Sequence, residues 1–223
     1  MEKIILFGAG NVAEVAYHYL TEDSSYEVVA FTIDKAYIKE DEFIGIPLVP
    51  FEDIEQNYPP SMFKMMVVIG FDNLNKTRAE RYNQAKEKGY ELVSYISSKA
   101  YVASNVKIGE NCFIAEFNSI QACSEIGDNV VLMSSNVINH HCKIKDHNWI
   151  SAGVIIAGCT TIESYCFIGV NASIGNGISI GRETYISAGA NITKSREQES
   201  VFIAANTPKF KLTSPMFLRF TKM

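Results

Sequence analysis

The sequence predicts a small α/β domain followed by a parallel β-helix. Three observations carry this prediction: a glycine-rich turn between a strand and a helix near the start, an aliphatic residue at every sixth position of the second half, and a basic tail after it. They divide the chain into residues 1–92, 93–206 and 207–223. With 223 residues, 47% of them hydrophobic, the chain is long enough to bury two modest cores.

The first domain opens with an apolar run and a glycine-rich turn. Residues 3–7 (KIILF) predict a buried strand, and residues 8–13 (GAGNVA) lead into a helix. A second predicted strand ends at Asp34, so a G-x-G-x-x-G/A turn stands in its strand–turn–helix context with an acid about twenty residues later. Glycines there let a diphosphate approach the backbone at a helix N-terminus. The pattern predicts a Rossmann-like half-domain that binds a nucleotide through Gly8, Gly10, Asn11 and Asp34.

A third apolar run, MMVVIGF, predicts a further strand that leads to Gly70 and Asn73. We expect these two residues to complete the nucleotide site. Residues 1–92 have room for one βαβαβ unit and not for both halves of a dinucleotide-binding domain. The site is therefore predicted to hold one nucleotide. The alternative is that GAGNVA is only a tight strand–helix turn.

The second half of the chain repeats every six residues. From residue 96 to residue 192 every sixth residue is Ile, Val or Leu, and most residues four positions later are small. Neither an α-helix, with a period of 3.6, nor a flat strand, with a period of 2, accounts for this spacing. The aliphatic positions are Ile96, Val102, Ile108, Ile114, Ile120, Ile126, Leu132, Ile138, Ile144, Ile150, Ile156, Ile162, Ile168, Ile174, Ile180, Ile186 and Ile192.

A three-sided coil of short parallel strands accounts for the period. One hexad forms each side, and three hexads form a turn of eighteen residues. The aliphatic side chain then fills the interior while the small residue fits a corner. Residues eighteen apart stack, so Ala122, His140 and Gly158 are expected in one column. A β-sandwich of short strands would need varied turn lengths, which the sequence lacks.

The repeat, with segments such as IGENCF, IGDNVV and IGRETY, resembles that of the hexapeptide-repeat acyltransferases, whose coils are left-handed. With the half-domain in front, the chain resembles the nucleotide-sugar acetyltransferases of the bacillosamine and perosamine N-acetyltransferase kind and the sialic-acid O-acetyltransferases. This resemblance implies a homotrimer that transfers an acetyl group from acetyl-CoA to an amino (dideoxy) sugar on a nucleotide, for surface-glycan biosynthesis. The front domain would hold the nucleotide sugar, and the coils would hold acetyl-CoA between subunits.

Acetyl transfer from a thioester needs a base for the attacking amine or hydroxyl, and histidine suits that role because its pKa lies near neutrality. The segment INHHC resembles the family's catalytic strand, which makes His140 the base. Its expected neighbours in the stack, Ala122 and Gly158, leave room for a substrate. The alternative is an outward-facing histidine in a turn.

Three positions depart from the family pattern. His141 stands where the family has an acidic partner, and it cannot raise the basicity of His140 as a carboxylate would. Trp149 matches the place of a second family histidine near the acetyl group, and Met133 matches that of an asparagine. We therefore predict a catalytic pair of His140 and His141, and an altered acceptor pocket at Trp149 and Met133.

The resemblance also indicates where CoA would bind. Backbone N–H groups beside small residues of the later turns are expected to hold it, and the tail has four basic residues and no acidic one. The tail would contact CoA phosphates through Lys209 or would cap the open end of the coil, and the sequence leaves both open. The predicted CoA-binding residues are Gly153, Gly158, Ala188, Gly189 and Lys209.

Composition limits the other functions. A net charge of −5 argues against nucleic acid as a partner, and no apolar stretch reaches the roughly 20 residues of a membrane span. Five cysteines without a CxxC pair predict a reduced, cytoplasmic protein. Cys123, His141 and Cys159 stack at eighteen-residue steps, but a straight column is a poor tetrahedron, so no metal site is predicted.

The sequence leaves three other functions open. A sugar O-acetyltransferase would use the same coil, but a hydroxyl needs more help from a base than an amine, and the missing carboxylate beside His140 favours the amine. A trimer that binds nucleotide sugar without catalysis would account for the changed positions. A zinc hydrase of the γ-carbonic-anhydrase kind ranks low because His140, His141 and His147 are clustered.

Overall fold

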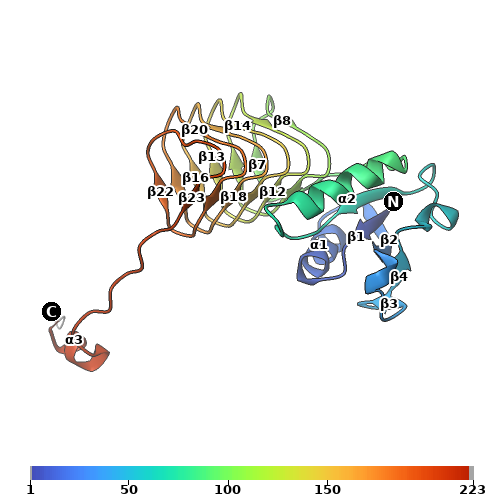
Figure 1. Ribbon diagram of the computed structural model, residues 1–223, viewed down its shortest axis with the longest axis horizontal. Coiled ribbons are helices and arrows are strands. Elements are labelled where there is room, and N and C mark those ends of the chain that lie inside the picture. Colours follow the sequence, from blue (N-terminus) through green and yellow to red (C-terminus); the bar gives the residue numbers. More distant parts are fainter. Residues whose placement is uncertain (1, 221–223) are drawn as a thin grey trace.

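The computed structural model describes residues 2–220 and contains a small α/β domain followed by a long coil of two-residue strands (Figure 1). The elements of the front domain are β1 (Glu2–Phe7), α1 (Asn11–Glu22), β2 (Tyr26–Ile33), the 3-10 turn η1 (Lys35–Tyr37), β3 (Glu42–Phe43), β4 (Ile46–Pro50), η2 (Ile54–Gln56), β5 (Lys64–Val67) and α2 (Lys76–Glu87). Its sheet has the order β3-β4-β2-β1-β5, and all neighbours are parallel except β3 and β4.

The two helices cover opposite faces of this sheet (Figure 1). Because side chains alternate along a strand, Ile4 and Leu6 of β1 pack with α1 while Ile5 and Phe7 pack with α2. The predicted strand at residues 3–7 and the helix after the glycine-rich turn are confirmed.

Sequence patterns did not indicate the pair β3 and β4. Pro47 and Pro50 interrupt the apolar run of β4, and proline cannot donate to a ladder of hydrogen bonds. β3 is the edge strand and pairs only with Ile46 and Pro47, so the rest of β4 has a neighbour on one side, where missing donors are tolerated.

The coil has three sides, each a sheet of parallel strands that stack at eighteen-residue intervals, which is consistent with a left-handed β-helix of hexapeptide repeats. We call the sides the docked face, the charged face and the neutral face. The docked face contains β6 (Tyr95–Ile96), β9 (Phe113–Ile114), β12 (Val131–Leu132), β15 (Trp149–Ile150), β18 (Phe167–Ile168), β21 (Tyr185–Ile186) and β23 (Val201–Phe202). The charged face contains β8 (Lys107–Ile108), β11 (Glu125–Ile126), β14 (Lys143–Ile144), β17 (Thr161–Ile162) and β20 (Ser179–Ile180). The neutral face contains β7 (Tyr101–Val102), β10 (Ser119–Ile120), β13 (Val137–Ile138), β16 (Ile155–Ile156), β19 (Ser173–Ile174) and β22 (Asn191–Ile192).

The predicted aliphatic column fills the interior of the coil. All its members from Ile114 to Ile192 are buried, and Val102 and Ile108 are partly buried. Ile96 differs from the prediction, because it is 40% exposed although β6 pairs in register with β9. No turn precedes β6 in the stack, so nothing covers this side chain. The period is confirmed, and only the first rung is open.

Each corner of the coil is a tight turn with one residue in the left-handed conformation. From residue 111 to residue 189 every sixth residue has a φ between 54 and 72°. Cys123, His141 and Cys159 occupy this turn position. Within residues 2–220 no group of three or more His, Cys, Asp or Glu could hold a metal ion.

The front domain packs on the docked face. The outward residues Phe113, Val131, Trp149 and Phe167 are buried in one cluster with α1 and β1. Full burial of one such side chain stabilises a fold by about 1.5–3 kcal/mol. The hydrophobic contact therefore fixes the front domain on one side of the coil and leaves the other two sides uncovered by it.

Residues 207–220 leave the coil at the end far from the front domain and finish in α3 (Ser214–Phe220), which has no buried residue (Figure 1). The backbone N–H of Ala204 donates to Ser187 Oγ, and no hydrogen bond ties residues 205–212 to the coil. Within the described residues the tail therefore extends away from the coil. The two expectations for it, a cap on the coil and a contact with CoA phosphates, stay predictions. Lys222 lies outside the described residues.

Candidate active site

His140 lies at the corner between the neutral and charged faces, which we call the His140 corner (residues 121–124, 139–142 and 157–160). Its side chain is exposed. A Cβ atom at Gly158, one turn later, would lie 2.8 Å from Cε1 and 3.0 Å from Nε2 of His140. Gly158 has no positive φ, so the ring and not the backbone requires a glycine there. The imidazole thus lies over a bare backbone with open space beyond it.

The ring of His141 contacts the ring of His140. The Nδ1 atoms of His140 and His141 are 3.1 Å apart, and the rings are nearly perpendicular, at 84°. Two neutral imidazoles share such a hydrogen bond only if one Nδ1 carries a proton. When His140 donates, its Nε2 keeps the lone pair that a general base needs. His141 can hold this tautomer, but it adds no negative charge.

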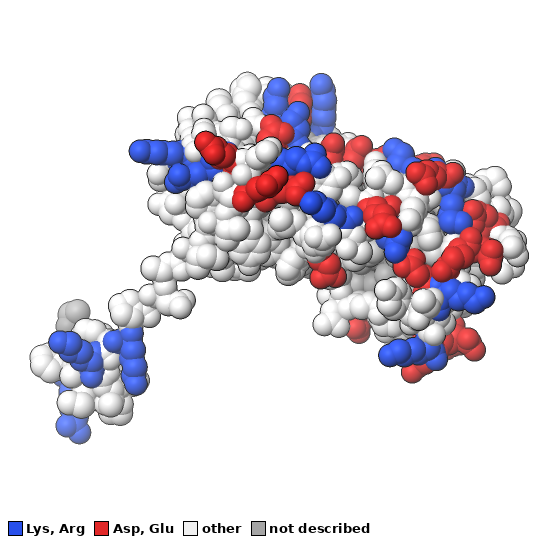
Figure 2. Space-filling view, in the orientation of Figure 1, with Lys and Arg blue, Asp and Glu red and all other residues white. Residues whose placement is uncertain are grey.

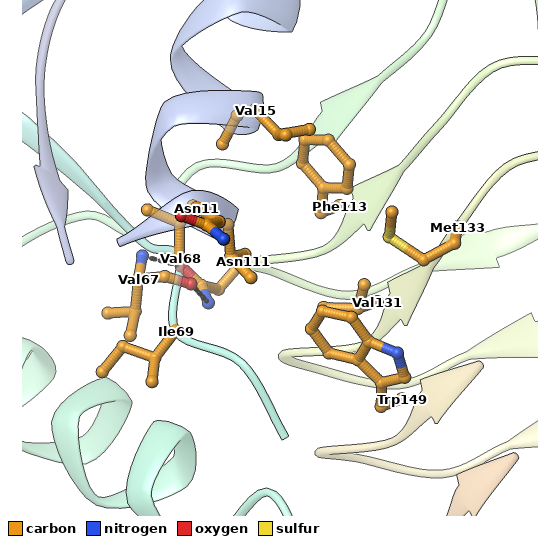
Figure 3. A pocket seen from close by; sticks show the side chains of 12 residues that line it. Asn11, Val15, Val67, Val68, Ile69, Asn111, Phe113, Val131, Met133 and Trp149 are labelled. Atoms are coloured by element: carbon orange, nitrogen blue, oxygen red, sulfur yellow. Dashed lines mark hydrogen bonds between the residues drawn. The ribbon is translucent and has the colours of Figure 1, made fainter. Parts of the chain in front are cut away.

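An interdomain pocket of about 160 Å³ lies between α1, the end of β5 and the docked face (Figure 3). Val15, Phe113, Val131, Met133 and Trp149 give it largely apolar walls (Figure 3). Pockets that enclose a whole small ligand are at least about 300 Å³, so this one fits part of a ligand. Met133 and Trp149, both predicted from the sequence, line it together.

Asn11 and the start of α1 supply the polar edge of this pocket. Helix α1 begins after Gly10 without a side-chain cap, and the side chain of Asn11 makes no hydrogen bond within the described residues. The first N–H groups of a helix favour anions. Asn111 also lines the pocket, but it is used structurally, since its Oδ1 accepts from the N–H of Val67 at 2.7 Å.

The loop after β5 is held against the coil by Arg78, which is fully buried. Its guanidinium donates to the carbonyl of Gly70 at 3.1 Å, to Oδ1 of Asn75 at 3.0 Å and to Oδ1 of Asn129 at 3.1 Å. Burial lowers the pKa of Arg78 to about 9, and within residues 2–220 no carboxylate pairs with it. The positive charge of the guanidinium is therefore stabilised by hydrogen bonds to uncharged oxygen atoms.

This loop is strained, because Asn73, Leu74 and Asn75 all have a positive φ. Asn75 Nδ2 also donates to the carbonyl of Cys166 at 3.0 Å. Residues in sparsely populated backbone regions persist only where neighbours over-determine them. The Arg78 and Asn75 contacts therefore fix this loop with Gly70 beside Val12 of α1. The predicted substrate residue Asn73 is exposed and does not line the interdomain pocket.

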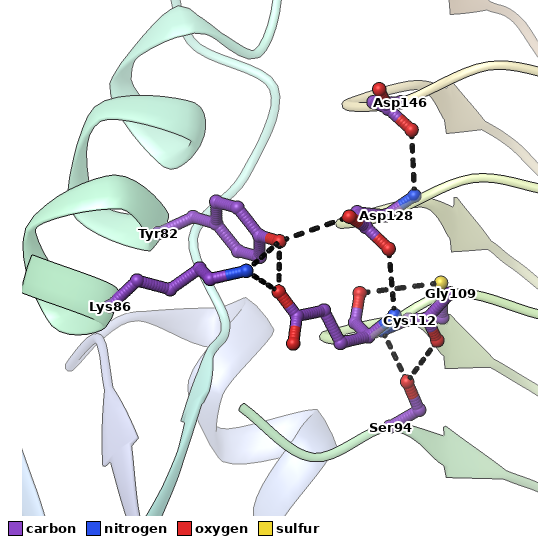
Figure 4. Close-up of polar contacts among 8 residues, drawn as sticks. Tyr82, Lys86, Ser94, Gly109, Cys112, Asp128 and Asp146 are labelled. Atoms are coloured by element: carbon purple, nitrogen blue, oxygen red, sulfur yellow. Dashed lines mark hydrogen bonds and ion pairs between the residues drawn. The ribbon is translucent and has the colours of Figure 1, made fainter. Parts of the chain in front are cut away.

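A second polar contact joins α2 to the coil (Figure 4). Tyr82 donates to Glu110 and, at 3.2 Å, to Oδ2 of Asp128, and Lys86 pairs with Glu110. Burial opposes ionisation of Glu110, but the hydrogen bonds from Lys86 and Tyr82 lower its pKa below the ordinary value. Asp128 Oδ1 accepts from the N–H of Glu110 at 3.0 Å. These contacts tie α2 of the front domain to the coil.

Two predicted nucleotide-binding residues have other surroundings than expected. Asp34 does not line the interdomain pocket; it pairs with Arg81 at 2.7 Å in a separate hollow beside α2. Gly8 is required by packing, because a Cβ there would lie 2.8 Å from the carbonyl oxygen of Val68. Gly10 has free space around it, because a Cβ atom there would meet no atom within 4 Å.

The predicted CoA residues do not form one cluster within the chain. Gly153 and Gly189 are left-handed turn residues at the corner between the docked and neutral faces, and Ala188 is exposed beside Gly189. Gly158 belongs to the His140 corner, and Lys209 lies in the tail. The neutral face separates the two corners.

Sequence reasoning missed several residues that build these sites: Arg78 and Asn75 as clamps, and Asn111, Phe113 and Val131 as pocket walls. A signal for the walls was present. The residue before each inward aliphatic of the docked face is large and apolar at every eighteenth position. These residues are Tyr95, Phe113, Val131, Trp149, Phe167 and Tyr185.

Comparison with known proteins identifies the repeat. Residues 159–194 match the family model for the hexapeptide repeat of succinyl-transferase. Residues 159–194 are therefore similar to the hexapeptide repeat. The bifunctional protein GlmU of Clostridium novyi is 26% identical over 136 residues, which is 53% of this chain and 30% of GlmU. An acyl-[acyl-carrier-protein]–UDP-N-acetylglucosamine O-acyltransferase of Agrobacterium fabrum is 27% identical over 37% of this chain and 33% of its own. The chain spans about a third of the length of these curated relatives.

Solved structures share the whole architecture. The acetyltransferase domain of PglB from Neisseria gonorrhoeae is 23% identical with a TM-score of 0.78, over 87% of this chain and 93% of that domain. PerB from Caulobacter crescentus, solved with CoA and GDP-perosamine, is 22% identical with a TM-score of 0.79, over 90% and 93%. WeeI from Acinetobacter baumannii is 20% identical with a TM-score of 0.77, over 90% and 96%. The predicted resemblance is confirmed for the repeat and the fold.

Proposed function

We propose that this protein is an acetyl-CoA-dependent N-acetyltransferase that acts on an amino sugar carried on a nucleotide, in the assembly of a surface glycan. The observation that carries the proposal is the exposed ring of His140 over the bare backbone of Gly158, on a fold shared with PerB bound to CoA and GDP-perosamine. We interpret the front sheet as a Rossmann-like half-domain and the coil as left-handed. All five cysteines are free, which supports a reduced, cytoplasmic setting.

The chemistry follows from the tautomer of His140. The sugar amine attacks the thioester carbonyl carbon, a C–N bond forms, and the C–S bond breaks. Nε2 of His140 takes the proton of the amine and returns it to the leaving CoA thiolate. His141 holds the tautomer without adding charge, which suits an amine better than a hydroxyl. N-acetylation is therefore favoured over O-acetylation.

Neighbouring subunits are needed to complete this site. In a three-sided coil the His140 corner lies opposite the docked face, so His140 and the interdomain pocket of one chain lie on opposite sides of the coil. The neutral face has no charged outward residue and exposes Tyr101 by 63% and Ile155 by 50%. We propose a homotrimer in which neutral faces pack near the His140 corner and bring the pocket of one chain to His140 of the next.

The ligands divide between the domains. The start of α1, with Gly10 and Asn11, fits the diphosphate of the nucleotide sugar, and the apolar pocket at Met133 and Trp149 fits an apolar part of the sugar such as a deoxy carbon. Gly153, Gly158, Ala188 and Gly189 border the neutral face, where CoA would lie between subunits. Asp34 would reach the nucleotide only by leaving Arg81.

The first test is thiol release from acetyl-CoA with a panel of UDP-, dTDP- and GDP-linked amino sugars. We expect free CoA with at least one amino sugar and none with the matching hydroxyl sugar. Release with the hydroxyl sugar alone would make the protein an O-acetyltransferase. Tight binding of a nucleotide sugar with no thiol release would make it a non-catalytic binder.

The second test concerns assembly. Light scattering should report three times 24.8 kDa. Ile155→Glu places a charge on the neutral face and should yield monomers without activity, because a buried unpaired charge is costly. The matched control, Thr161→Glu on the charged face, should remain trimeric and active. A fully active monomer would contradict the shared site.

A further inference from the structure

We propose that the tail after the coil, residues 207–220, is an anchor that binds the surface of an anionic lipid bilayer. The proposal does not depend on the acetyltransferase reaction. It rests on the composition of the tail, on the exposure of its side chains and on its place in the molecule.

The charge of the tail is opposite to that of the rest of the chain. From residue 201 to the end there are four basic residues and no acidic one, whereas residues 1–200 hold 16 basic and 25 acidic residues. Figure 2 shows blue without red over the tail, against a mixed surface elsewhere. Within the described residues, Lys209, Lys211 and Arg219 form no ion pair. A cationic segment with no acid of its own is attracted to a surface of negative charge.

The tail is also strongly apolar, which a merely solvated tail would not be. Large side chains come at Phe210, Met216, Phe217, Leu218 and Phe220, with exposed fractions between 46 and 83%. Segments that stay disordered in water are poor in aromatic and aliphatic residues. Here such residues form a knob, in which the rings of Phe210 and Phe217 meet edge to face at 5.7 Å.

Helix α3 gathers three apolar side chains on one side. At 3.6 residues per turn, Met216, Phe217 and Phe220 lie within about 100° of one another, and Arg219 lies at the border of this side, next to Met216. A basic side chain at the border of an apolar side can reach the lipid headgroups while the apolar residues enter the acyl region. Within residues 2–220 no helix is long and apolar enough to cross a membrane.

The position of the tail favours a bilayer over the protein's own surface. It leaves the end of the coil that is farthest from the front domain (Figure 1). The last rung beside its exit exposes Val201 by 65% and Ile203 by 73%, so apolar surface continues from the coil into the tail. A flat partner that meets this end would contact the rung and the knob together.

The experiment is sedimentation of the full chain with vesicles of phosphatidylglycerol and phosphatidylcholine, against vesicles of phosphatidylcholine alone. We expect binding to the anionic vesicles at low salt, a large loss at high salt, and none to the neutral vesicles. K211Q/R219Q should lower the partition coefficient by roughly 30-fold, since each basic residue near an anionic surface contributes a factor of roughly five. M216S/F220S should also lower it, through lost insertion of apolar side chains. The control K143Q/K145Q removes the same charge from exposed positions on the coil and should change nothing.

Three results would overturn the proposal. One is the absence of binding to anionic vesicles at low salt. Another is an equal effect of K143Q/K145Q and K211Q/R219Q, which would mean non-specific attraction. The third is a smaller assembly by light scattering for K211Q/R219Q or M216S/F220S without lipid, which would assign the tail to a neighbouring subunit. Thiol release, measured on the same proteins in solution, should be unchanged in both tail variants.

Discussion

The His140 corner and the corner under α2, which we call the Arg78 corner (residues 127–130, 145–148 and 163–166), are built from the same hexad, and each has a histidine with a positive φ. His141 at the first corner is exposed, and its Nδ1 lies 3.1 Å from Nδ1 of His140. His147 at the second is half-buried, its Nδ1 lies 2.9 Å from Asn129 Nδ2, and its carbonyl accepts from Arg78. One corner is covered by the front domain and the other is bare. The repeat is the same at both corners. Whether a corner stabilises the fold or can take part in catalysis therefore depends on whether the front domain covers it.

Substitutions at the His140 corner, which the front domain does not cover, should have the largest effect on activity. His140→Ala should reduce turnover by roughly 10²–10⁴, the usual contribution of a general base. The measurement is kcat for thiol release at saturating substrates, with acetyl-CoA binding as the control for folding.

His141→Ala separates the two histidines of that corner. It should cost far less than His140→Ala, because His141 supports only the tautomer, and His141→Glu should raise the rate by supplying the missing carboxylate. A greater loss in His141→Ala than in His140→Ala would reverse the assignment of base and partner.

The covered corner should show the largest effect on stability. Arg78→Met removes the donor for Gly70, Asn75 and Asn129 and leaves Oδ1 of the buried Asn75 without a partner, which should cost about 3 kcal/mol of unfolding free energy. Oδ1 of Asn129 keeps the hydrogen bond from Asn111. Urea denaturation measures this cost. Arg78→Lys keeps the charge but not the planar fork, so it should recover only part. An unchanged midpoint in Arg78→Met would show that the clamp is not needed.

Gly10→Val tests the ligand edge between the domains. A side chain there meets no protein atom within 4 Å, so stability should hold while nucleotide-sugar affinity falls by roughly tenfold. Calorimetry with the nucleotide sugar and with acetyl-CoA distinguishes the two ligands. Equal loss of both would indicate damage to the fold and not to the diphosphate site.

The smallest effect is a pH dependence of stability at the covered corner. Burial lowers the pKa of His147 below its ordinary 6.5, and nearby Arg78 lowers it further, while Asp146 and Asp128 oppose the shift. The unfolded chain then binds more protons, so the stabilisation is complete above pH 6.5 and is lost as the pH falls toward the pKa of the folded state. His147→Gln should flatten the unfolding free energy between pH 5 and 7. A slope that persists in this variant would have another origin.

The coil was predictable from the sequence. Each hexad contains the residues of one side and its interior side chain, and because the period is unbroken, the spacing alone predicts which residues stack, including His140 and Gly158. Ile96 was misjudged only because an end rung lacks a neighbour, which periodicity does not describe. The glycine-rich turn was predictable for the same reason, since its strand, turn and helix are contiguous.

The side of the coil that the front domain covers was not predictable from the sequence. Because the front domain packs there, Met133 and Trp149 line a pocket and Arg78 is buried among uncharged oxygen atoms. Asp34 pairs with Arg81, and His140 lies at the opposite corner. Docking depends on shape and burial between segments far apart in sequence, and a repeat that looks alike on all three sides does not specify it. One sequence feature does mark the covered side: aromatic and aliphatic residues recur at eighteen-residue steps on the docked face. This feature is recognised once the three faces are known.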